Sequence, residues 1–377
     1  MKVINSIADL RELARRRVPR AFFYYVDGGS YDELTLNRNR ADLDALRLRQ
    51  RVLVDVSKQN LGTTILGSDV ALPLVLAPTG MAGFIHGDGE MLAARAAEAC
   101  GIPFCLSTVS VCSIEDVRGA TKAPFWFQLY VLKDRGYTRE LVDRAAAAGC
   151  TALMFTVDIP IGALRRRDAR NGLTVPPRIG LRNALEMAGK PRWAWSLATA
   201  RRREFGNLSA AVARARGVHF SQWVQSQVDA SLTWDDLARL REQWKGKLII
   251  KGILDPADAR RAVDLGADAL VVSNHGGRQL DGAASSISSL PGVVEAVQGR
   301  CEVLMDSGVR SGQDILKAVA LGARGAMCGR AWLYGLGAMG EAGVKLAIQI
   351  MRGELATSMA LTGCSDVRAV DRKLLVD

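Results

Sequence analysis

The sequence of 377 residues predicts a single α/β domain folded as a (β/α)8 barrel of the TIM type, and three observations support this. Eight short apolar runs alternate with amphipathic or Ala-rich stretches from residue 72 onward. Each run is almost continuously apolar, which is typical of parallel strands buried on both faces. No G-x-G-x-x-G motif follows the first run, which disfavours an open dinucleotide-binding sheet. Eight strand–helix units therefore favour a closed barrel.

The elements follow in order along the chain. Residues 1–71 are expected to form a helical N-terminal lead-in and residues 72–377 the barrel, with a long insertion, 161–230, after the fourth strand. That insertion is too long for an ordinary connection between a strand and a helix. The expected strands are 72–80, 103–109, 124–131, 152–160, 247–253, 269–276, 302–309 and 325–332. The expected helices are 90–100, 113–120, 138–149, 234–244, 255–266, 288–300, 311–322 and 341–361.

The charge of the chain narrows the class of partner. A formal net charge of +11 is compatible with nucleic acid, an anionic membrane surface, or an anionic substrate and cofactor. The basic residues are spread along the chain and are densest around 165–203, without a basic tail. Because no zinc-finger or RNP-type signature accompanies them, a nucleic-acid-binding protein is only a remote alternative.

The cysteines and the N-terminus indicate the compartment. The seven cysteines form no C-x-x-C pair and lie mostly in apolar stretches, as reduced thiols do, so neither a metal site nor a disulfide framework is indicated. The N-terminal stretch lacks the apolar segment of a signal peptide, and no uncharged apolar run reaches the length of a spanning helix. A cytoplasmic protein is expected.

Polar residues end the eight expected strands. In a (β/α)8 barrel the carboxyl ends of all strands meet at one mouth, where the active site lies. Three of the ends carry polar pairs two residues apart, whose side chains share one face of the strand. The convergence of all eight ends predicts a functional site. The residues at these ends are Thr79, Ser107, Gln128, Tyr130, Thr156, Asp158, Lys251, Ser273, His275, Asp306, Arg310 and Arg330.

Part of the chemistry follows from the residue types. His275, in "SNHGGRQLDG", is the natural general acid/base because imidazole titrates near neutrality, and Asp158 is suited to orient it. Arg278 offers a planar fork for a carboxylate or phosphate. Glycine-rich turns with arginines after the last two strands imply a phosphate-bearing cofactor. A Schiff-base role for Lys251 is the rival interpretation, which would not need His275 and two arginines in addition.

Several motifs together resemble one known family. The sequence contains "FYYVDGGSYDELTLNRN", "APTGMAG", "WFQLYVLKDRG", "TVDIP", "KGILDPADA", "SNHGGRQLDG", "DSGVRSG" and "GRAW", and in combination these are similar to the FMN-dependent α-hydroxy-acid dehydrogenase and oxidase family. The resemblance covers nearly the whole chain and is strongest to the bacterial, quinone-linked L-lactate dehydrogenases. It implies FMN as cofactor and oxidation of L-lactate, or a close L-2-hydroxy acid, to the 2-oxo acid. A quinone would accept the electrons, and mandelate- or glycolate-type enzymes of the family are the alternative.

The resemblance also implies roles for individual residues. Tyr24, Arg165 and Arg278 would bind the substrate carboxylate, Tyr130 would bond the substrate hydroxyl, and Asp158 would support His275 as the catalytic base. The residues implied to bind FMN are Thr79, Ser107, Gln128, Thr156, Lys251, Ser273, Asp306, Gly308, Arg310, Gly329 and Arg330.

Two positions of "APTG" depart from the nearest relatives. Thr79 stands where the lactate dehydrogenases are expected to have valine, and in this the chain is more like mandelate dehydrogenases. Gly80 stands where oxidases of the family tend to carry alanine, which favours a quinone or another acceptor over oxygen.

The insertion carries a basic, tryptophan-bearing stretch, "GKPRWAWSLATARRREF" at 189–205. Trp193 and Trp195 are flanked by lysine and arginines, a composition that suits an anionic membrane surface. The resemblance implies that this segment attaches the protein peripherally to the cytoplasmic face of the inner membrane. It also implies a homo-oligomer, for which a tetramer is one form found in the family. The alternative is an insertion whose tryptophans pack on the barrel.

Overall fold

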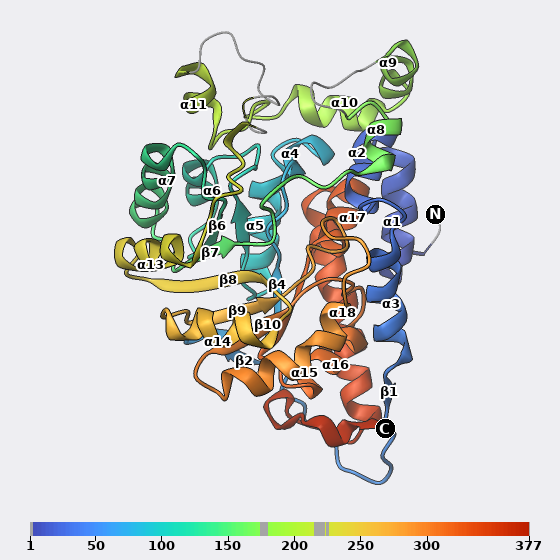
Figure 1. Ribbon diagram of the computed structural model, residues 1–377. Coiled ribbons are helices and arrows are strands. Elements are labelled where there is room, and N and C mark those ends of the chain that lie inside the picture. Colours follow the sequence, from blue (N-terminus) through green and yellow to red (C-terminus); the bar gives the residue numbers. More distant parts are fainter. Residues whose placement is uncertain (1–2, 174–179, 215–222, 224–225, 377) are drawn as a thin grey trace.

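The structure is a computed structural model, and it describes residues 3–173, 180–214, 223 and 226–376 (Figure 1). Its centre is a sheet of eight parallel strands in the order β4-β11-β10-β9-β8-β7-β6-β5. One parallel bridge between Leu76 and Phe104 joins the two outer strands, so the sheet closes into the predicted barrel. The strands are β4 (Leu74–Leu76), β5 (Cys105–Ser107), β6 (Trp126–Leu129), β7 (Ala152–Thr156), β8 (Lys247–Ile253), β9 (Ala269–Val272), β10 (Glu302–Met305) and β11 (Gly325–Cys328).

The barrel interior is a packed apolar core. Alternate strand residues point inward, among them Trp126, Met154 and Ile249. A hairpin of β2 (Thr63–Ile65) and β3 (Ser68–Val70), which the sequence did not predict, covers the end of the barrel where the strands begin. Ile65 of this hairpin packs into the interior core and closes this end of the barrel, while the opposite, C-terminal mouth is where this fold places its active site.

The helices surround the barrel (Figure 1). Several begin with a capping box, as at Ser113–Asp116 and Ser311–Asp314, which satisfies free backbone N–H groups of the first turn. The predicted strand 325–332 is wrong at its end: β11 stops at Cys328, and Arg330 starts a helix. The barrel helices are α5 (Gly89–Ala99), α6 (Ile114–Ala120), α7 (Arg135–Ala147), α13 (Trp234–Gln243), α14 (Pro256–Asp264), α15 (Ser286–Val297), α16 (Gly312–Ala320), α17 (Arg330–Met339) and α18 (Glu341–Leu361).

The N-terminal lead-in is helical, as predicted, and lies against the last barrel units. It comprises α1 (Ile7–Arg17), α2 (Arg20–Asp27) and α3 (Leu34–Ala45), and α1 packs along α17. The short strand β1 (Arg47–Leu48) pairs antiparallel with β12 (Leu375–Val376), which joins the lead-in to the C-terminal end of the chain. The lead-in thereby brings α2 to the barrel mouth.

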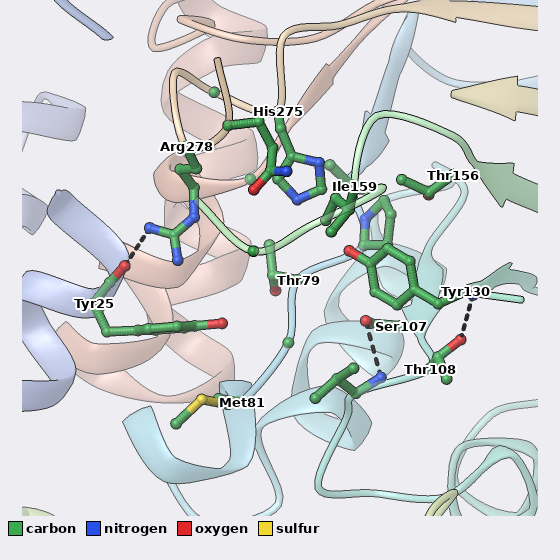
Figure 2. A pocket seen from close by; sticks show the side chains of 18 of the residues that line it. Tyr25, Thr79, Met81, Ser107, Thr108, Tyr130, Thr156, Ile159, His275 and Arg278 are labelled. Atoms are coloured by element: carbon green, nitrogen blue, oxygen red, sulfur yellow. Dashed lines mark hydrogen bonds between the residues drawn. The ribbon is translucent and has the colours of Figure 1, made fainter. Parts of the chain in front are cut away.

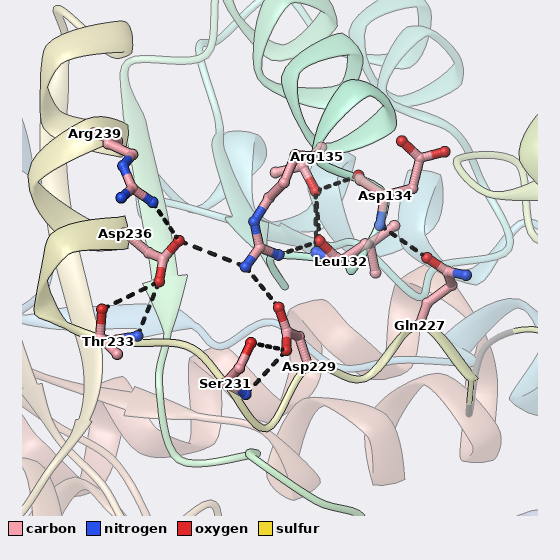
Figure 3. Close-up of polar contacts among 10 residues, drawn as sticks. Leu132, Asp134, Arg135, Gln227, Asp229, Ser231, Thr233, Asp236 and Arg239 are labelled. Atoms are coloured by element: carbon pink, nitrogen blue, oxygen red, sulfur yellow. Dashed lines mark hydrogen bonds and ion pairs between the residues drawn. The ribbon is translucent and has the colours of Figure 1, made fainter.

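The insertion forms short helices beyond the barrel mouth, at the top of Figure 1: α8 (Arg166–Arg170), α9 (Leu181–Ala188), α10 (Pro191–Ala198) and α11 (Ser209–Arg214). Parts of the predicted insertion, 174–179, 215–222 and 224–225, lie outside the described residues. Its returning end is fixed to the β6–α7 connection, where Arg135 binds Asp229 at 2.6 Å and the amide of Asp134 donates to the Oε1 of Gln227 at 3.1 Å (Figure 3). The insertion is therefore tied to the barrel at its root.

The tryptophans of the insertion differ in their surroundings. The Nε1 of Trp193 donates to the carbonyl of Phe84 at 2.9 Å, and its ring lies 5.6 Å from that of Phe22. Trp193 is thus partly buried against these two residues, as the alternative interpretation predicts for the tryptophans. Trp195, by contrast, is 71% exposed. Within the described ranges, no helix combines the length and apolar character that crossing a bilayer requires.

Candidate active site

A cavity of about 1070 Å³ opens at the C-terminal ends of the strands (Figure 2). Ligand pockets typically measure about 300–1,000 Å³, so this one has room for a cofactor and a small substrate. Its walls come from the barrel strands, from α2 of the lead-in and from the insertion. Of the residues predicted for the site, those that line it are Thr79, Ser107, Tyr130, Thr156, Arg165, Lys251, His275, Arg278, Asp306, Gly308, Arg310, Gly329 and Arg330.

His275 is held in an unusual backbone conformation at the end of β9. Its φ is 58°, in the left-handed region that few non-glycine residues adopt, and its amide donates to the Oγ of Ser273 at 3.0 Å. Gly276 and Gly277 continue the left-handed turn, and a Cβ on Gly277 would lie 2.4 Å from the amide nitrogen of Leu36. The glycines of "SNHGG" are thus required by both conformation and space.

The imidazole of His275 pairs with a carboxylate. Its Nδ1 lies 3.0 Å from the Oδ1 of Asp158, as predicted from the sequence. An Nδ1–H donated to Asp158 leaves Nε2 as the ring nitrogen available to a substrate. The carboxylate thus fixes the orientation of the ring at the end of β9.

Two arginines meet over one tyrosine beside His275. The guanidinium of Arg278 lies 4.7 Å from the ring centre of Tyr25 (Figure 2). That of Arg165 lies 5.5 Å from the same ring centre. Arg278 donates to the carbonyls of Tyr25 and Gly28. Burial, followed by the nearby charge of Arg165, lowers the pKa of Arg278. Two close cations of this kind favour an anionic ligand, such as a carboxylate.

The prediction of Tyr24 for this site does not fit the geometry. Tyr24 does not line the cavity, and its ring lies 5.7 Å from the guanidinium groups of Arg20 and Arg167. Tyr25, the next residue of α2, occupies the cavity instead. Successive helix positions point about 100° apart. The docking of α2 therefore decides which tyrosine enters.

Buried polar atoms along one wall lack partners. They are Thr79 Oγ1, Gln128 Nε2, Thr156 Oγ1 and Asp158 Oδ2, none of which has a hydrogen-bond partner in the described part of the chain. Gln128 is not among the residues that line the cavity. Its Oε1 accepts from the Oγ of Ser107 at 3.1 Å, so its amide nitrogen points away from Ser107. Buried polar groups normally pair. These atoms therefore fit a bound group edged with nitrogen and oxygen atoms, as the flavin ring is.

Lys251 lies on the same wall of the cavity and forms an ion pair with Asp306. Its Nζ is 2.7 Å from the Oδ2 of Asp306 and donates to the Oγ of Ser273, behind the lining, at 2.6 Å. Burial disfavours the charged lysine, but Asp306 more than offsets this and raises the pKa of Lys251. Burial likewise opposes the charged carboxylate, and Lys251 lowers the pKa of Asp306. A fixed ammonium thus faces the ring site, and a Schiff-base nucleophile, which must be neutral, does not fit.

The cavity is also cationic around Arg330, which lies close to Arg310 and Arg278. Arg330 donates to the carbonyls of Val26 and Gly28, each at 2.8 Å, and burial with the nearby charges of Arg310 and Arg278 lowers its pKa to about 9. A Cβ on Gly308 would lie 2.9 Å from the carbonyl oxygen of Asn39, so the backbone comes close here. Clustered guanidinium groups bound to carbonyls favour an added anion, and phosphate is the anion that this fold places there.

The cavity chemistry is that of a flavin-dependent oxidoreductase that acts on the CH–OH group of a 2-hydroxy acid. The model of the FMN-dependent dehydrogenase family matches residues 14–377, and the chain belongs to this family. The buried polar atoms without partners, the Lys251 ammonium and the arginines at 310 and 330 fit the ring and phosphate of FMN.

Curated relatives and solved structures agree with this assignment. The chain is 50% identical to an L-lactate dehydrogenase of Caulobacter vibrioides over 100% of this chain and 98% of the relative. It is 48% identical to an L-lactate dehydrogenase of Actinobacillus pleuropneumoniae over 100% and 99%. A crystal structure of the monotopic membrane protein (S)-mandelate dehydrogenase superposes with a TM-score of 0.94 at 35% identity, with 100% of both chains covered. A mandelate oxidase structure gives a TM-score of 0.83 at 37% identity, over 99% and 98%.

Proposed function

We propose that the protein oxidises L-lactate, or a close L-2-hydroxy acid, to the 2-oxo acid and passes the electrons to a quinone. The observation that carries the proposal is the Arg165–Arg278 pair, which meets beside the His275–Asp158 pair in one cavity. A carboxylate held by the arginines would present its neighbouring carbon and hydroxyl to the imidazole. The names of the L-lactate dehydrogenase relatives support lactate as the substrate.

Each residue would have a separate task. Arg278 and Arg165 bind and orient the carboxylate, and Tyr130, whose pKa is raised by burial and by Asp158, stays protonated as a donor to the substrate oxygen. His275 takes a proton at Nε2, and Asp158 stabilises the imidazolium that results. FMN, when bound, accepts the two electrons of the oxidation.

FMN would be held by the groups described above. Its ring would lie against Thr79, Gln128 and Thr156, with the Lys251 ammonium stabilising negative charge on it, and its phosphate would lie between Arg310 and Arg330. No metal ion is needed for these tasks in the proposed mechanism.

A spectrum tests the proposal. The purified protein should be yellow, L-lactate should bleach it without air, and a soluble quinone analogue should restore the colour. A mandelate-type substrate is the second candidate, favoured by Thr79 and by the TM-score of 0.94 to (S)-mandelate dehydrogenase. Values of kcat/KM for lactate, mandelate and glycolate separate the candidates. A protein that takes up no FMN, or whose flavin no 2-hydroxy acid reduces, contradicts the proposal.

We also propose a peripheral contact of the insertion with the cytoplasmic face of the inner membrane. Trp195 and Leu185, 71% and 66% exposed, present apolar surface on α10 and α9. Such a contact would bring the cavity near a membrane-borne quinone. Wild type should float with anionic liposomes, and Trp195→Ser should float less. Leu361→Ser, which removes a 58%-exposed side chain at the end of α18, is the matched control. If wild type stays with the unbound fraction at low salt, the membrane proposal is wrong.

A further inference from the structure

Asp168 is an acid of the substrate pocket that the proposed mechanism does not use. It belongs to α8, is only 6% exposed and lines the cavity. Its Oδ2 lies 3.3 Å from the Nε of Arg165, so it holds that guanidinium through the inner nitrogen. Asp168 and the Tyr25 ring thus both position the guanidinium of Arg165 in the cavity.

The charges around the substrate carboxylate can be counted. Arg165 and Arg278 are the cations, and Asp168 is the acid set among them. Arg330, which shares the Gly28 carbonyl with Arg278, is left to the phosphate of FMN. Burial raises the pKa of Asp168, while the charges of Arg165 and Arg278 act in the opposite direction. The neighbouring Glu33 is engaged elsewhere, by the Nη2 of Arg167 at 2.6 Å and the amide of Gly29 at 2.9 Å. With Asp168 ionised, the two arginines retain one net positive charge, which a single carboxylate neutralises.

We infer that Asp168 makes the pocket selective for 2-hydroxy monocarboxylates and against 2-hydroxy dicarboxylates. The inference rests on the proposed function and specifies its substrate class by charge. A second carboxylate would enter a pocket whose positive charge is already neutralised and would meet the Asp168 carboxylate at close range in a partly buried site. Repulsive groups of this kind are a general source of specificity.

The test removes the charge and keeps the shape. Values of kcat/KM are measured at pH 8 for Asp168→Asn and wild type with L-lactate, L-2-hydroxysuccinate and the monoamide of 2-hydroxysuccinate that lacks its distal charge. The dicarboxylate and its monoamide have nearly the same size. In Asp168→Asn the ratio of kcat/KM for the dicarboxylate to that for the monoamide should rise on the order of tenfold. The ratio of monoamide to lactate should change by less than about twofold.

Control variants separate charge from structure. Asp168→Glu keeps the charge and should keep the wild-type ratio. Asp32→Asn removes the same net charge from an exposed ion pair with Arg166 and should also leave the ratio unchanged. Asp168→Ser is the second test variant if Asp168→Asn does not retain FMN. The inference is overturned if the ratio of kcat/KM for the dicarboxylate to that for the monoamide is unchanged in the variants that lack the carboxylate. An equal rise of kcat/KM for both compounds is such a result and would indicate added space in the pocket.

Failure of the proposed function gives a different result. In that case L-lactate does not reduce the wild-type flavin, whatever the behaviour of Asp168→Asn. The selectivity is then measured from the dissociation constants of the dicarboxylate and its monoamide, followed by their effect on the flavin spectrum. If the ratio of the two dissociation constants is the same in wild type and in Asp168→Asn, the inference is overturned independently of turnover.

Discussion

At the barrel mouth Lys251 and the His275 turn are each held by more than one neighbour, whereas the insertion presents its side chains on short helices outside the barrel. Lys251 is fixed by Asp306 and Ser273, and the His275 turn by Ser273, Asp158 and two glycines. In the insertion, α10 has no buried residue. It is held by single contacts such as that of Trp193 with Phe84, and the returning end of the insertion is fixed where Arg135 binds Asp229 (Figure 3).

This difference separates two kinds of task. Proton transfer and flavin binding need groups held in place, and these groups stand on strand ends. Substrate capture and surface contact tolerate looser support, and here the insertion contributes Arg165, Asp168 and Trp195. Substitutions at the mouth should therefore lower kcat, and substitutions in the insertion should raise KM or alter association.

The largest effect is expected at His275. The variant His275→Gln should retain FMN, because the ring contacts Asp158 rather than the phosphate end, but lose kcat on the order of a thousandfold. Single-turnover reduction of the flavin by L-lactate measures the loss. Near-normal reduction would show that His275 is not the base. It would also remove the main support for assigning proton transfer to the barrel mouth rather than to the insertion.

The two arginines compare the regions directly. Arg278→Lys should lower kcat and raise KM, for a combined loss of about a hundredfold in kcat/KM, because an ammonium reproduces neither the planar fork nor the stacking on Tyr25. Arg165→Lys, in the insertion, should raise KM about tenfold and leave kcat within about twofold. Steady-state kinetics with L-lactate measures both. Equal losses of kcat in the two variants would contradict the assignment of kcat effects to the barrel mouth and KM effects to the insertion.

A smaller effect is expected at the two adjacent tyrosines of α2, whose variants should differ in KM. Tyr25→Phe removes a hydroxyl from the cavity and should raise KM for L-lactate roughly tenfold, the usual scale for a hydrogen bond to a charged group. Tyr24→Phe should change KM by less than about twofold, since Tyr24 does not line the cavity. The opposite order would restore the role predicted for Tyr24 from the sequence.

The smallest effect is expected at the root of the insertion. Hydrogen bonds from Ser231 and the ion pair with Arg135 lower the pKa of Asp229 to about 2, so the folded state gains stability from its charge above about pH 4. Asp229→Asn should therefore lower the free energy of unfolding by about 0.5–1 kcal/mol at pH 7, a difference that shrinks as the pH falls toward 2.

Urea unfolding at several pH values measures this difference. Asp264→Asn, which breaks the ion pair of Asp264 with Arg300 on the barrel surface, is the control. It should leave protease cleavage within the insertion unchanged, while Asp229→Asn should accelerate it. Equal cleavage in both variants would mean that the insertion does not depend on this root.

Local patterns predicted most of the barrel and most of the site. All eight strands were found, because a strand buried on both faces is apolar along its whole length and is visible without knowledge of its neighbours. The strand ends then had to converge, which brought His275, Asp158 and Lys251 together. Helix α17 was missed because "RAWLYGLGAM" is buried on all sides and has no polar face to reveal a helical period.

What the sequence missed depends on contacts between distant segments. Whether Tyr24 or Tyr25 enters the cavity is set by the docking of α2, and whether Trp193 is exposed is set by Phe84 and Phe22. Asp168 was missed because, in the sequence, an acid among arginines is typical of a surface ion pair. Only the structure shows that it lines the cavity. The pairing of β1 with β12 joins residues at opposite ends of the sequence.

The way the barrel closes has a consequence during synthesis. Strand β4 pairs along three residues with β11, which follows it by about 250 residues, and only through one bridge with β5, its successor in the chain. At about 5–20 residues per second, the ribosome needs roughly 10–50 s to deliver that partner. Throughout this interval a nascent chain shows an apolar strand with an open edge, which invites association with other chains. Release before β11 has emerged should thus yield an aggregating fragment, and chaperone demand should peak in the last third of translation.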